Sequence, residues 1–444
     1  MFRRRAPEET PGGLRRTLSL WQVTASGVGI VIGAGIYVLI GAAANDAGNG
    51  LWLSFVIAAV VSGLTGLSYA ELAGLYPSAG AEFAFARAAF GRFAGFMAGW
   101  VMIAGNVIAA AAVAIGFGHY LGFFVSIDVR VGAIALLAAL ALIIAGGLQR
   151  SIWLTVGLVA LQIGGLALVI VAGAPHIGEE DLLRGATVSG VMSGAALVFF
   201  AFIGFDEVVT LSEETRDAER TIPRALLLSL ALSTALYVAV GIAAVSTAGW
   251  EALAGSKTPL ALVMEEDWGG RATDIVALIA LASTVNTTLL VMTAASRLVY
   301  SIAREGYFPP AFARLGGPGD APQLAGLAVF AVASVFAAVA DIAFVASVTD
   351  FVVFVTFLVV NAAVVRLRFS RPDAARTMRV PLVVARVPAI AVAAFVLAAA
   401  MMTSLQASAW ALGLLVLAAG ALAWFVKAGR VAGADYPEAA SDAG

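Results

Sequence analysis

Two short segments of the sequence place glycine or carboxylate residues within long apolar stretches. Residues 32–36 read Ile-Gly-Ala-Gly-Ile, and residues 199–207 read Phe-Phe-Ala-Phe-Ile-Gly-Phe-Asp-Glu. A helix that opens at such a point exposes N–H groups at the positive end of one half and C=O groups at the negative end of the other. These two ends together suit a zwitterion, with its carboxylate on the N–H groups and its ammonium group on the carbonyls.

Other interpretations of the glycines at 27–35 differ in strength. Gly29 and Gly33 form a G-x-x-x-G pair, which also allows two membrane helices to pack closely. On glycine alone this alternative stays open. A dinucleotide-binding fingerprint is excluded despite the spacing of Gly27 and Gly29, because no strand precedes the segment.

The composition indicates that these segments lie in a membrane. Of 444 residues, 61% are hydrophobic and 12% are charged, and the mean hydropathy is +0.97, so the apolar surface cannot be hidden within a water-soluble globule. Cysteine is absent, which excludes disulfides and thiolate chemistry. The first apolar stretch, 20–44, is too long for a cleaved signal peptide and is interpreted as a span.

Windows of about 20 apolar residues, the length that crosses the hydrocarbon core, predict twelve transmembrane helices. They lie near 20–44, 51–74, 93–118, 131–148, 152–173, 190–211, 225–247, 273–300, 323–341, 343–367, 382–403 and 408–427. Among the 26 Lys and Arg residues, all but Arg130, Arg184, Lys257 and Arg271 then fall on the side of the N-terminus. The positive-inside rule therefore predicts that both termini are cytoplasmic.

The two glycine-containing segments fall in the first and the sixth predicted span. Within hydrocarbon an interrupted helix is tolerated only where protein or a polar cavity surrounds it. Two interruptions five spans apart are typical of transporters built from inverted repeats, whose substrate site lies where two broken helices meet near the midplane.

At this point the chain resembles the amino acid–polyamine–organocation superfamily of permeases, over nearly its whole length. Four segments carry the resemblance: Ile32 to Ile36; Ser68 to Ala73 followed by Pro77 to Phe83; Phe200 to Asp206; and Ala303 to Pro309 together with Leu367-Arg368, Arg371 to Asp373 and Arg379 to Pro381. The resemblance implies an all-α integral membrane fold with a 5+5 inverted-repeat (LeuT-like) core, broken helices 1 and 6, and two additional helices, 11 and 12.

The resemblance also implies a division of the chain. We expect a cytoplasmic N-terminal segment at 1–19, repeat 1 at 20–173, repeat 2 at 190–367, peripheral helices at 382–427 and a cytoplasmic tail at 428–444.

Carried over position by position, the resemblance implies a substrate site at the two interruptions. The N–H groups of Ala34 and Gly35 would hold a carboxylate, and the carbonyls of Val31, Phe200 and Ile203 would hold an ammonium group. Phe200 lies where related exchangers carry an aromatic gate, and Asn106 lies where they sense the side chain. The expected substrate-binding set is Val31, Ile32, Gly33, Ala34, Gly35, Asn106, Phe200, Phe202, Ile203 and Gly204.

Several other polar residues in the predicted spans are candidates for coupling or gating. Gln162 lies where proton-coupled relatives have a lysine, so coupling through that lysine cannot be carried over. Asp206 and Glu207 could cap a half-helix or gate the inner pathway. Asn286 and Thr287 belong to a hydroxyl-rich face that serves either packing or the pathway. Asp350 is either an outward-facing carboxylate near the external surface or a functional group within the membrane.

The sequence thus predicts a secondary active transporter, a permease or exchanger that moves small or neutral amino acids across the cell membrane by alternating access. A basic amino acid or polyamine antiporter is the alternative, and a channel is a remote one. An intramembrane enzyme lacks a recognisable nucleophile motif. No cofactor, metal or nucleic acid is expected; the expected partners are the amino acid, the lipid bilayer, and a coupling proton or counter-substrate, both favoured over sodium.

Overall fold

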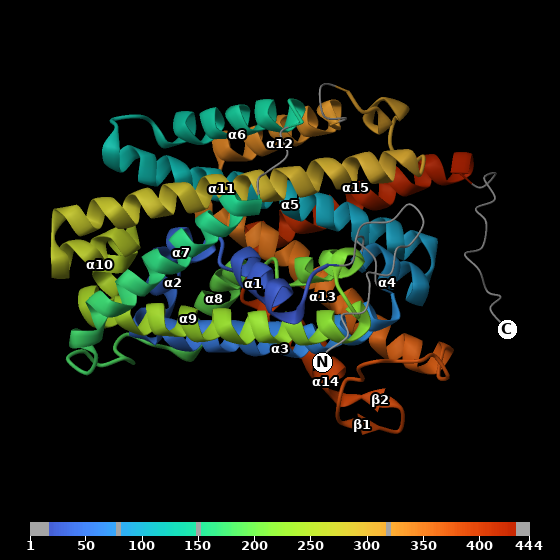
Figure 1. Cartoon of the computed structure of the whole chain (residues 1–444), viewed down its shortest axis with the longest axis horizontal. Coiled ribbons are helices and arrows are strands. Elements are labelled where there is room, and N and C mark those ends of the chain that lie inside the picture. The colour runs from blue at the N-terminus through green and yellow to red at the C-terminus, as the bar shows by residue number, and fades with distance from the viewer. Residues whose placement is uncertain (1–16, 77–80, 148–151, 317–320, 432–444) are drawn as a thin grey trace, which may run out of the picture.

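The computed structural model describes residues 17–76, 81–147, 152–316 and 321–431, and nearly all of them are helical (Figure 1). The predicted N-terminal segment up to residue 16, the start of the motif at 77–80 and the tail from 432 lie outside these residues.

The described part of the first half of the chain contains seven α-helices. They are α1 (Leu20–Val31), α2 (Gly35–Ala47), α3 (Leu51–Leu75), α4 (Ala81–Phe90), α5 (Arg92–Phe124), α6 (Val129–Ala145) and α7 (Ile152–Gly173), with the short 3-10 turns η1 (Gly48–Gly50) and η2 (Ala174–His176). Polar caps begin several of them: the Gln22 side chain accepts the Ser19 N–H at α1, and Asp128 accepts two N–H groups at α6.

The second half continues with α8 (Val188–Val198), α9 (Ala218–Gly255), α10 (Pro259–Trp268), α11 (Gly270–Arg304), α12 (Gln323–Val339), α13 (Ile342–Ser370), α14 (Ala389–Thr403) and α15 (Ala407–Val431). Three 3-10 segments lie between them, η3 (Phe199–Phe202), η4 (Asp206–Glu214) and η5 (Pro310–Ala313). Thr187 caps α8 and Asp341 caps α13 through their side-chain oxygens.

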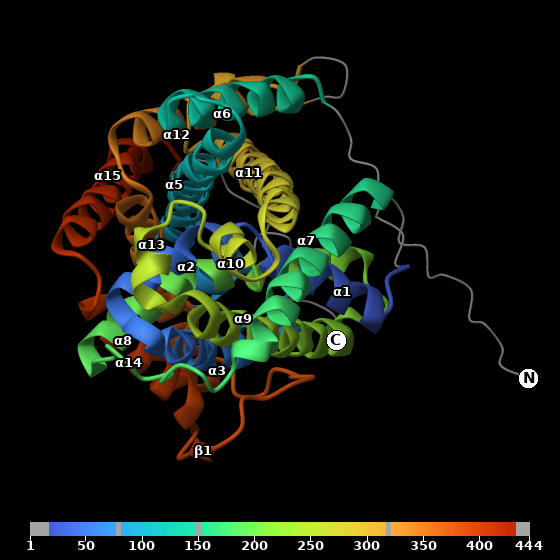
Figure 2. The ribbon, with the colours of Figure 1, turned by 90° about the vertical axis from the view of Figure 1, so that its left-hand side faces the viewer.

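The long helices run roughly parallel to the longest axis of the molecule, which is horizontal in Figure 1. Seen along that axis, α6 and α12 form one side of the bundle and α3 and α14 the opposite side (Figure 2). The small helix α4 and the end of α15 lie toward one end of the bundle, and α10 lies at the other (Figure 1).

Among the described residues, eight helical segments are long and apolar enough to cross a membrane. Four further apolar helices are shorter, namely Leu20–Val31, Val129–Ala145, Gln323–Val339 and Ala389–Thr403. The chain is therefore a helical multi-pass membrane protein, while the count of twelve spans stays a prediction.

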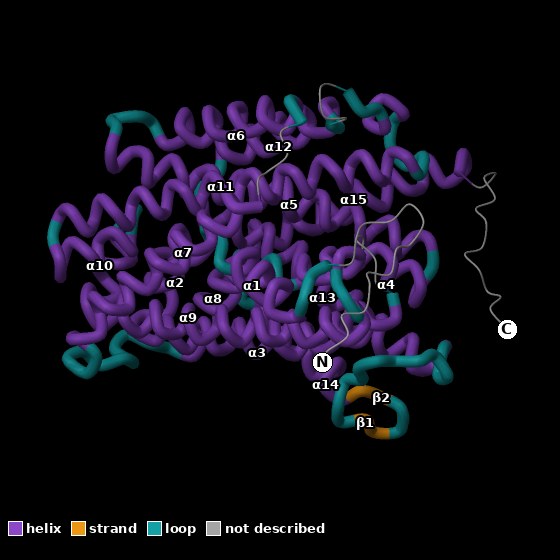
Figure 3. Tube along the Cα trace, in the orientation of Figure 1, coloured by secondary structure: helices purple, strands orange, loops and turns teal. Residues whose placement is uncertain are grey.

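The expectation that a span begins at residue 382 is wrong. Strands β1 (Val383–Val384) and β2 (Val387–Pro388) form an antiparallel hairpin, and α14 begins only at Ala389 (Figure 3). Ala385 and Arg386 have φ values of 48° and 72°, the left-handed conformation that a two-residue hairpin turn of type I′ requires. Apolar valines extended the hydropathy window into a segment that is not helical.

Candidate functional site

The first interruption separates α1 from α2 at residues 32–34. The helix ends at Val31, and the Gly33 N–H turns back to the Val31 carbonyl at 2.7 Å. The Ala34 N–H donates to the side-chain oxygen of Thr287 at 3.0 Å. Gly35 and Ile36 are the first two residues of α2, so their N–H groups lie at the positive end of this half-helix and have no acceptor in the preceding turn.

The second interruption follows α8 and extends from 199 to 205. The chain passes through η3, becomes extended at Ile203 and turns at Gly204, whose φ of +112° is in the region that only glycine adopts without strain. The Gly204 N–H donates to an oxygen of the Asp206 carboxylate at 3.2 Å. Asp206 therefore stabilises the turn that leads into η4.

The two interruptions pack directly against each other. A Cβ atom on Gly35 would lie 2.7 Å from the Ala201 Cα, and one on Gly204 would lie 3.1 Å from the Ile30 side chain. Backbone atoms thus approach so closely that only glycine fits at residue 35. We call residues 32–34 and 199–205 the paired interruptions.

Tyr237 of α9 joins the paired interruptions, although sequence reasoning missed it. Its buried hydroxyl lies 2.7 Å from the Val31 carbonyl and 3.0 Å from the Ala201 carbonyl. One O–H carries one proton, so the two carbonyl groups share a single donor. Two C=O groups at the broken helices therefore converge on one shared donor, and the Val31 carbonyl also accepts the Gly33 N–H.

Two of the hydroxyl groups on α11 reach neighbouring helices. Besides Thr287, which contacts the Ala34 N–H, Ser283 accepts a hydrogen bond from the Gln162 side chain of α7 at 3.0 Å. Ser283 and Thr287 are four residues apart and so share one face of α11. This face connects the first interruption to Gln162, one of the predicted coupling candidates.

The other predicted substrate-binding residues have different surroundings. Phe200 is buried at the second interruption, whereas the Phe202 ring packs edge-on against Tyr237 at 5.2 Å between ring centres. The Asn106 amide donates to Met102 of its own helix at 3.0 Å, and no described contact connects it with the paired interruptions. Ile32, predicted for the site, is buried at the end of α1, and Asn286, a coupling candidate, is buried in α11.

Carboxylates gather beside the second interruption. Asp206 and Glu207 begin η4, and both interact electrostatically with Glu82 of α4. The sequence had suggested that Asp206 and Glu207 either cap a half-helix or gate the inner pathway. The hydrogen bond from the Gly204 N–H holds the turn before η4, and the capping and gating roles of the two carboxylates stay predictions.

Asp350 is not the exposed, outward-facing carboxylate that one alternative expected. Asp350 is fully buried in α13, and both carboxylate oxygens lack a hydrogen-bond partner among the described residues. Asp350 is close in sequence to the predicted external loop, but this did not predict its burial. Whether a side chain is exposed depends on the face of the helix that carries it.

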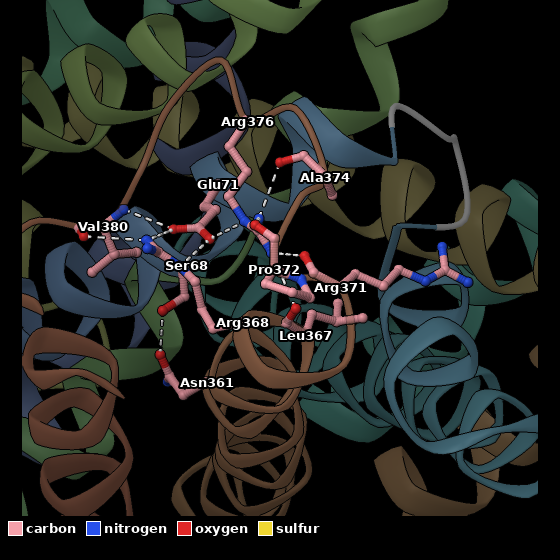
Figure 4. Close-up of polar contacts among 10 residues, drawn as sticks. All are labelled: Ser68, Glu71, Asn361, Leu367, Arg368, Arg371, Pro372, Ala374, Arg376 and Val380. Atoms are coloured by element: carbon pink, nitrogen blue, oxygen red, sulfur yellow. Dashed lines mark hydrogen bonds and ion pairs between the residues drawn. The ribbon is translucent and has the colours of Figure 1, made fainter. Parts of the chain in front are cut away.

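A second polar region, at the other end of α13, is fully paired (Figure 4). Glu71 of α3 accepts two hydrogen bonds from Arg368, at 2.6 and 2.8 Å, one from Arg376 at 3.0 Å and one from the Val380 N–H at 2.7 Å. Glu71 thus forms ion pairs with both Arg368 and Arg376. We call Glu71, Arg368, Arg376 and Val380 the Glu71 cluster.

A pocket of about 450 Å³ lies at the end of α2 and the start of α8. Its lining is mostly polar and includes Asp46, Ser189 and Gln406, which are exposed, and Ser347 of α13. Charge distribution along the sequence predicts that this end faces the outside, so we call it the outer pocket. None of the residues that line the outer pocket belongs to the paired interruptions.

The described residues contain no group of three or more His, Asp and Glu side chains that could hold a metal ion. The polar groups available at the paired interruptions are therefore main-chain N–H and C=O groups, the Thr287 and Tyr237 hydroxyls and the Asp206 carboxylate. They can bind a small polar molecule but supply no activated nucleophile.

A multi-pass helical protein with two broken helices packed together has the architecture of a membrane transport protein. Residues 18–424 match the family model described as amino acid permease, so the chain belongs to that family, within the amino acid–polyamine–organocation superfamily. It is a transporter rather than an enzyme.

Similar proteins have been described in several organisms. An uncharacterized transporter of Mycobacterium tuberculosis is 34% identical over 68% of this chain and 69% of its own. A branched-chain amino acid permease of Bacillus subtilis is 28% identical over 83% of this chain and 84% of its own. A vacuolar cationic amino acid transporter of Arabidopsis thaliana is 30% identical over 81% of this chain and 61% of its own.

Proposed function

We propose that the protein is a secondary active transporter that carries small or neutral amino acids across the cell membrane by alternating access. The observation that carries this proposal is the close packing of the paired interruptions. It brings the positive end of α2 and the carbonyl groups of Val31 and Ala201 to one place.

The amino and carboxyl groups of an amino acid fit these two kinds of backbone end. The carboxylate would accept hydrogen bonds from the Gly35 and Ile36 N–H groups, where the helix dipole favours negative charge. The ammonium group would donate to the Val31 and Ala201 carbonyls in place of the Tyr237 hydroxyl. Ala34 has a partner in Thr287, so in this account its N–H becomes available only if Thr287 moves.

The proposed topology follows the sequence argument. Ten of the twelve proposed spans form a 5+5 inverted-repeat core, with repeat 1 at 20–173 and repeat 2 at 190–367. The helices α14 and α15 are peripheral, and both termini are cytoplasmic. The interruption in the first expected span of each repeat supports this arrangement.

The relatives suggest which substrates to compare. Buried Phe200 at the second interruption supports a small or neutral substrate. A basic amino acid is the second candidate, because cationic amino acid transporters are among the relatives. A methylthioribose transporter of Bacillus subtilis is 27% identical over 93% of this chain, so methylthioribose is included among the compounds to be tested.

Counterflow in proteoliposomes tests the proposal. Vesicles containing the purified protein are preloaded with an unlabelled mixture of the twenty amino acids, and entry of the same mixture in labelled form is followed. A carrier shows faster label entry with preloading than without it. Equal entry in both cases would indicate a pore, and no entry would refute amino acid transport.

A thermal-shift screen of the purified protein then identifies the substrate. The panel contains the twenty amino acids, putrescine, spermidine and methylthioribose. We expect stabilisation by neutral amino acids, because a ligand that binds only the folded protein raises its stability. Stabilisation by arginine, lysine or polyamines alone would replace the neutral substrate with the basic one.

A further inference from the structure

One face of α13 connects the outer pocket to the second interruption. Ser347 lines the outer pocket, whereas Phe354 and Phe357 lie against Phe199, with ring centres 4.4 and 5.3 Å apart. Asp350 is three residues after Ser347 and four before Phe354, and residues at these spacings share a helix face. Asp350 therefore faces α8 and η3, the half-helix that ends at the interruption.

The depth of Asp350 places it between these two regions. It lies one turn, about 4.5 Å, beyond Ser347 along α13, and about 12 Å from the start of the helix at Ile342. Ser347 is itself 5% exposed, and Asp350 is 0% exposed. The carboxyl group thus lies just beneath a polar pocket whose rim contains exposed residues.

The surroundings of Asp350 do not stabilise a negative charge. Neither oxygen accepts a hydrogen bond from the described residues, and no described cation pairs with it. An ionised carboxylate in an apolar site without a partner is strongly disfavoured, whereas the neutral acid is tolerated. The environment seen in the structure therefore favours the protonated, neutral form of the group over the carboxylate.

The described side chains on the elements packed against α13 include these ionisable groups: Tyr37 and Asp46 of α2; Tyr69 and Glu71 of α3; Glu82 and Arg87 of α4; and Arg92, His119 and Tyr120 of α5. The sequences of α8, η3, β2 and α14 contain none. Asp46 lines the outer pocket, and Glu71 is engaged by the arginines at the far end of α13.

We propose that Asp350 is the proton-binding site of the transport cycle, loaded through the outer pocket. An O–H bond forms on its carboxylate with a proton from outside water, and the neutral group then permits α8 to pack against α13. When the inner side opens, the O–H bond breaks and the proton passes to water there. The inference rests on the proposed amino acid transport and adds a coupling ion to it.

Uptake by wild-type proteoliposomes under an imposed proton gradient tests the inference. The probe is the labelled mixture of twenty amino acids, added with the outside about one pH unit more acidic than the lumen. For one proton per substrate this gradient supports about tenfold accumulation. The variant Asp350→Asn, which keeps the size of the side chain but cannot gain or lose this proton, should show none while its counterflow continues.

The matched control is Asp341→Asn, at the exposed N-terminal cap of the same helix. Asparagine caps helices as well as aspartate does, so this variant should accumulate label as wild type does. Asp350→Glu should restore a proton-dependent accumulation. A pH-sensitive dye in the lumen should report acidification on substrate addition for wild type and Asp341→Asn but not for Asp350→Asn.

The outcomes separate this inference from the proposed function. Absence of wild-type counterflow would refute both. Counterflow without any response to the proton gradient, or accumulation driven by a sodium gradient alone, would overturn only the proton site. An Asp350→Asn protein that still accumulates label under the proton gradient, or that is folded but has lost counterflow, would also overturn it.

Discussion

The paired interruptions and the Glu71 cluster are both buried polar regions, but their hydrogen bonds differ in kind. In the Glu71 cluster each carboxylate oxygen accepts two hydrogen bonds, and the remaining Arg376 donors reach the carbonyls of Leu367, Arg371, Pro372 and Ala374. At the paired interruptions, helix ends share few partners, such as the one Tyr237 hydroxyl between two carbonyls.

This difference separates structural from functional polarity. A buried charge whose partners are complete stabilises one arrangement and costs much when broken. Backbone groups left without full partners retain capacity for a ligand, and a helix interruption in a membrane persists only where such groups are accommodated. We therefore expect changes in the Glu71 cluster to affect stability and changes at the paired interruptions to affect transport.

The largest expected effect on transport comes from Gly35→Val. A Cβ atom there would lie 2.7 Å from the Ala201 Cα, and the branched side chain would force the two interruptions apart. Counterflow should be abolished while membrane insertion persists. Gly164→Val is the matched control, because a Cβ on Gly164 meets no atom within 4 Å, and it should transport normally. If Gly35→Val showed counterflow at the wild-type rate, the paired interruptions would not be part of the substrate site.

The largest expected effect on stability comes from Glu71→Gln. The substitution leaves Arg368 and Arg376, which are 10% and 1% exposed, without their counter-charge. Removing one partner of a buried ion pair costs about 3–5 kcal/mol. Thermal unfolding in detergent should occur at a clearly lower temperature. The control is Asp373→Asn, at an exposed position in the same loop, which should leave the unfolding temperature unchanged. Equal unfolding temperatures for the wild type and both variants would contradict a structural role for the Glu71 cluster.

A smaller effect is expected from Phe200→Ala. Phe200 is 6% exposed at the second interruption, and loss of its contact with substrate should remove about 1–2 kcal/mol, a five- to thirtyfold rise in the dissociation constant. Calorimetry with the amino acid found by the thermal-shift screen measures this rise. Phe123→Ala, at an exposed position near the end of α5, should bind as wild type does. Unchanged binding by Phe200→Ala would place the ring outside the pocket.

The smallest effect concerns His176, in η2 beyond the end of α7. Hydrogen bonds to Glu179 and then to Asp267 raise the pKa of His176 above its usual 6.5. A pKa that is higher in the folded than in the unfolded protein stabilises the fold at pH values below the unfolded-state pKa. This stabilisation is lost as the pH rises through the folded-state pKa.

His176→Gln should therefore lower the unfolding temperature slightly at about pH 5.5 and hardly at all at about pH 9. Scanning calorimetry of both proteins at the two pH values measures the difference. A larger loss at the higher pH would have the wrong sign for this interaction.

Sequence reasoning predicted the helical membrane fold and both interruptions, because glycine content and hydropathy are local properties. It could not predict the Tyr237 bridge, since that hydroxyl meets a carbonyl 206 positions earlier in the chain. Nor could it place Thr287 on the Ala34 N–H, because which hydroxyl of α11 reaches another helix depends on helix rotation.

Two errors have physical causes of the same type. Hydropathy assigned residues 383–388 to a span, although valines serve a hairpin as well as a helix. The depth of Asp350 along the chain suggested a place near the surface, although packing of α13 buries it completely.

The central claim is that the amino acid binds at the paired interruptions. A structure of the wild-type protein with its substrate, chosen by the thermal-shift screen, tests this most directly. We predict a carboxylate oxygen about 2.7–3.2 Å from the Gly35 or Ile36 nitrogen, with the ammonium group at hydrogen-bonding distance from the Val31 carbonyl. A substrate held in the outer pocket, or anywhere that leaves these backbone groups without contact, would contradict the claim.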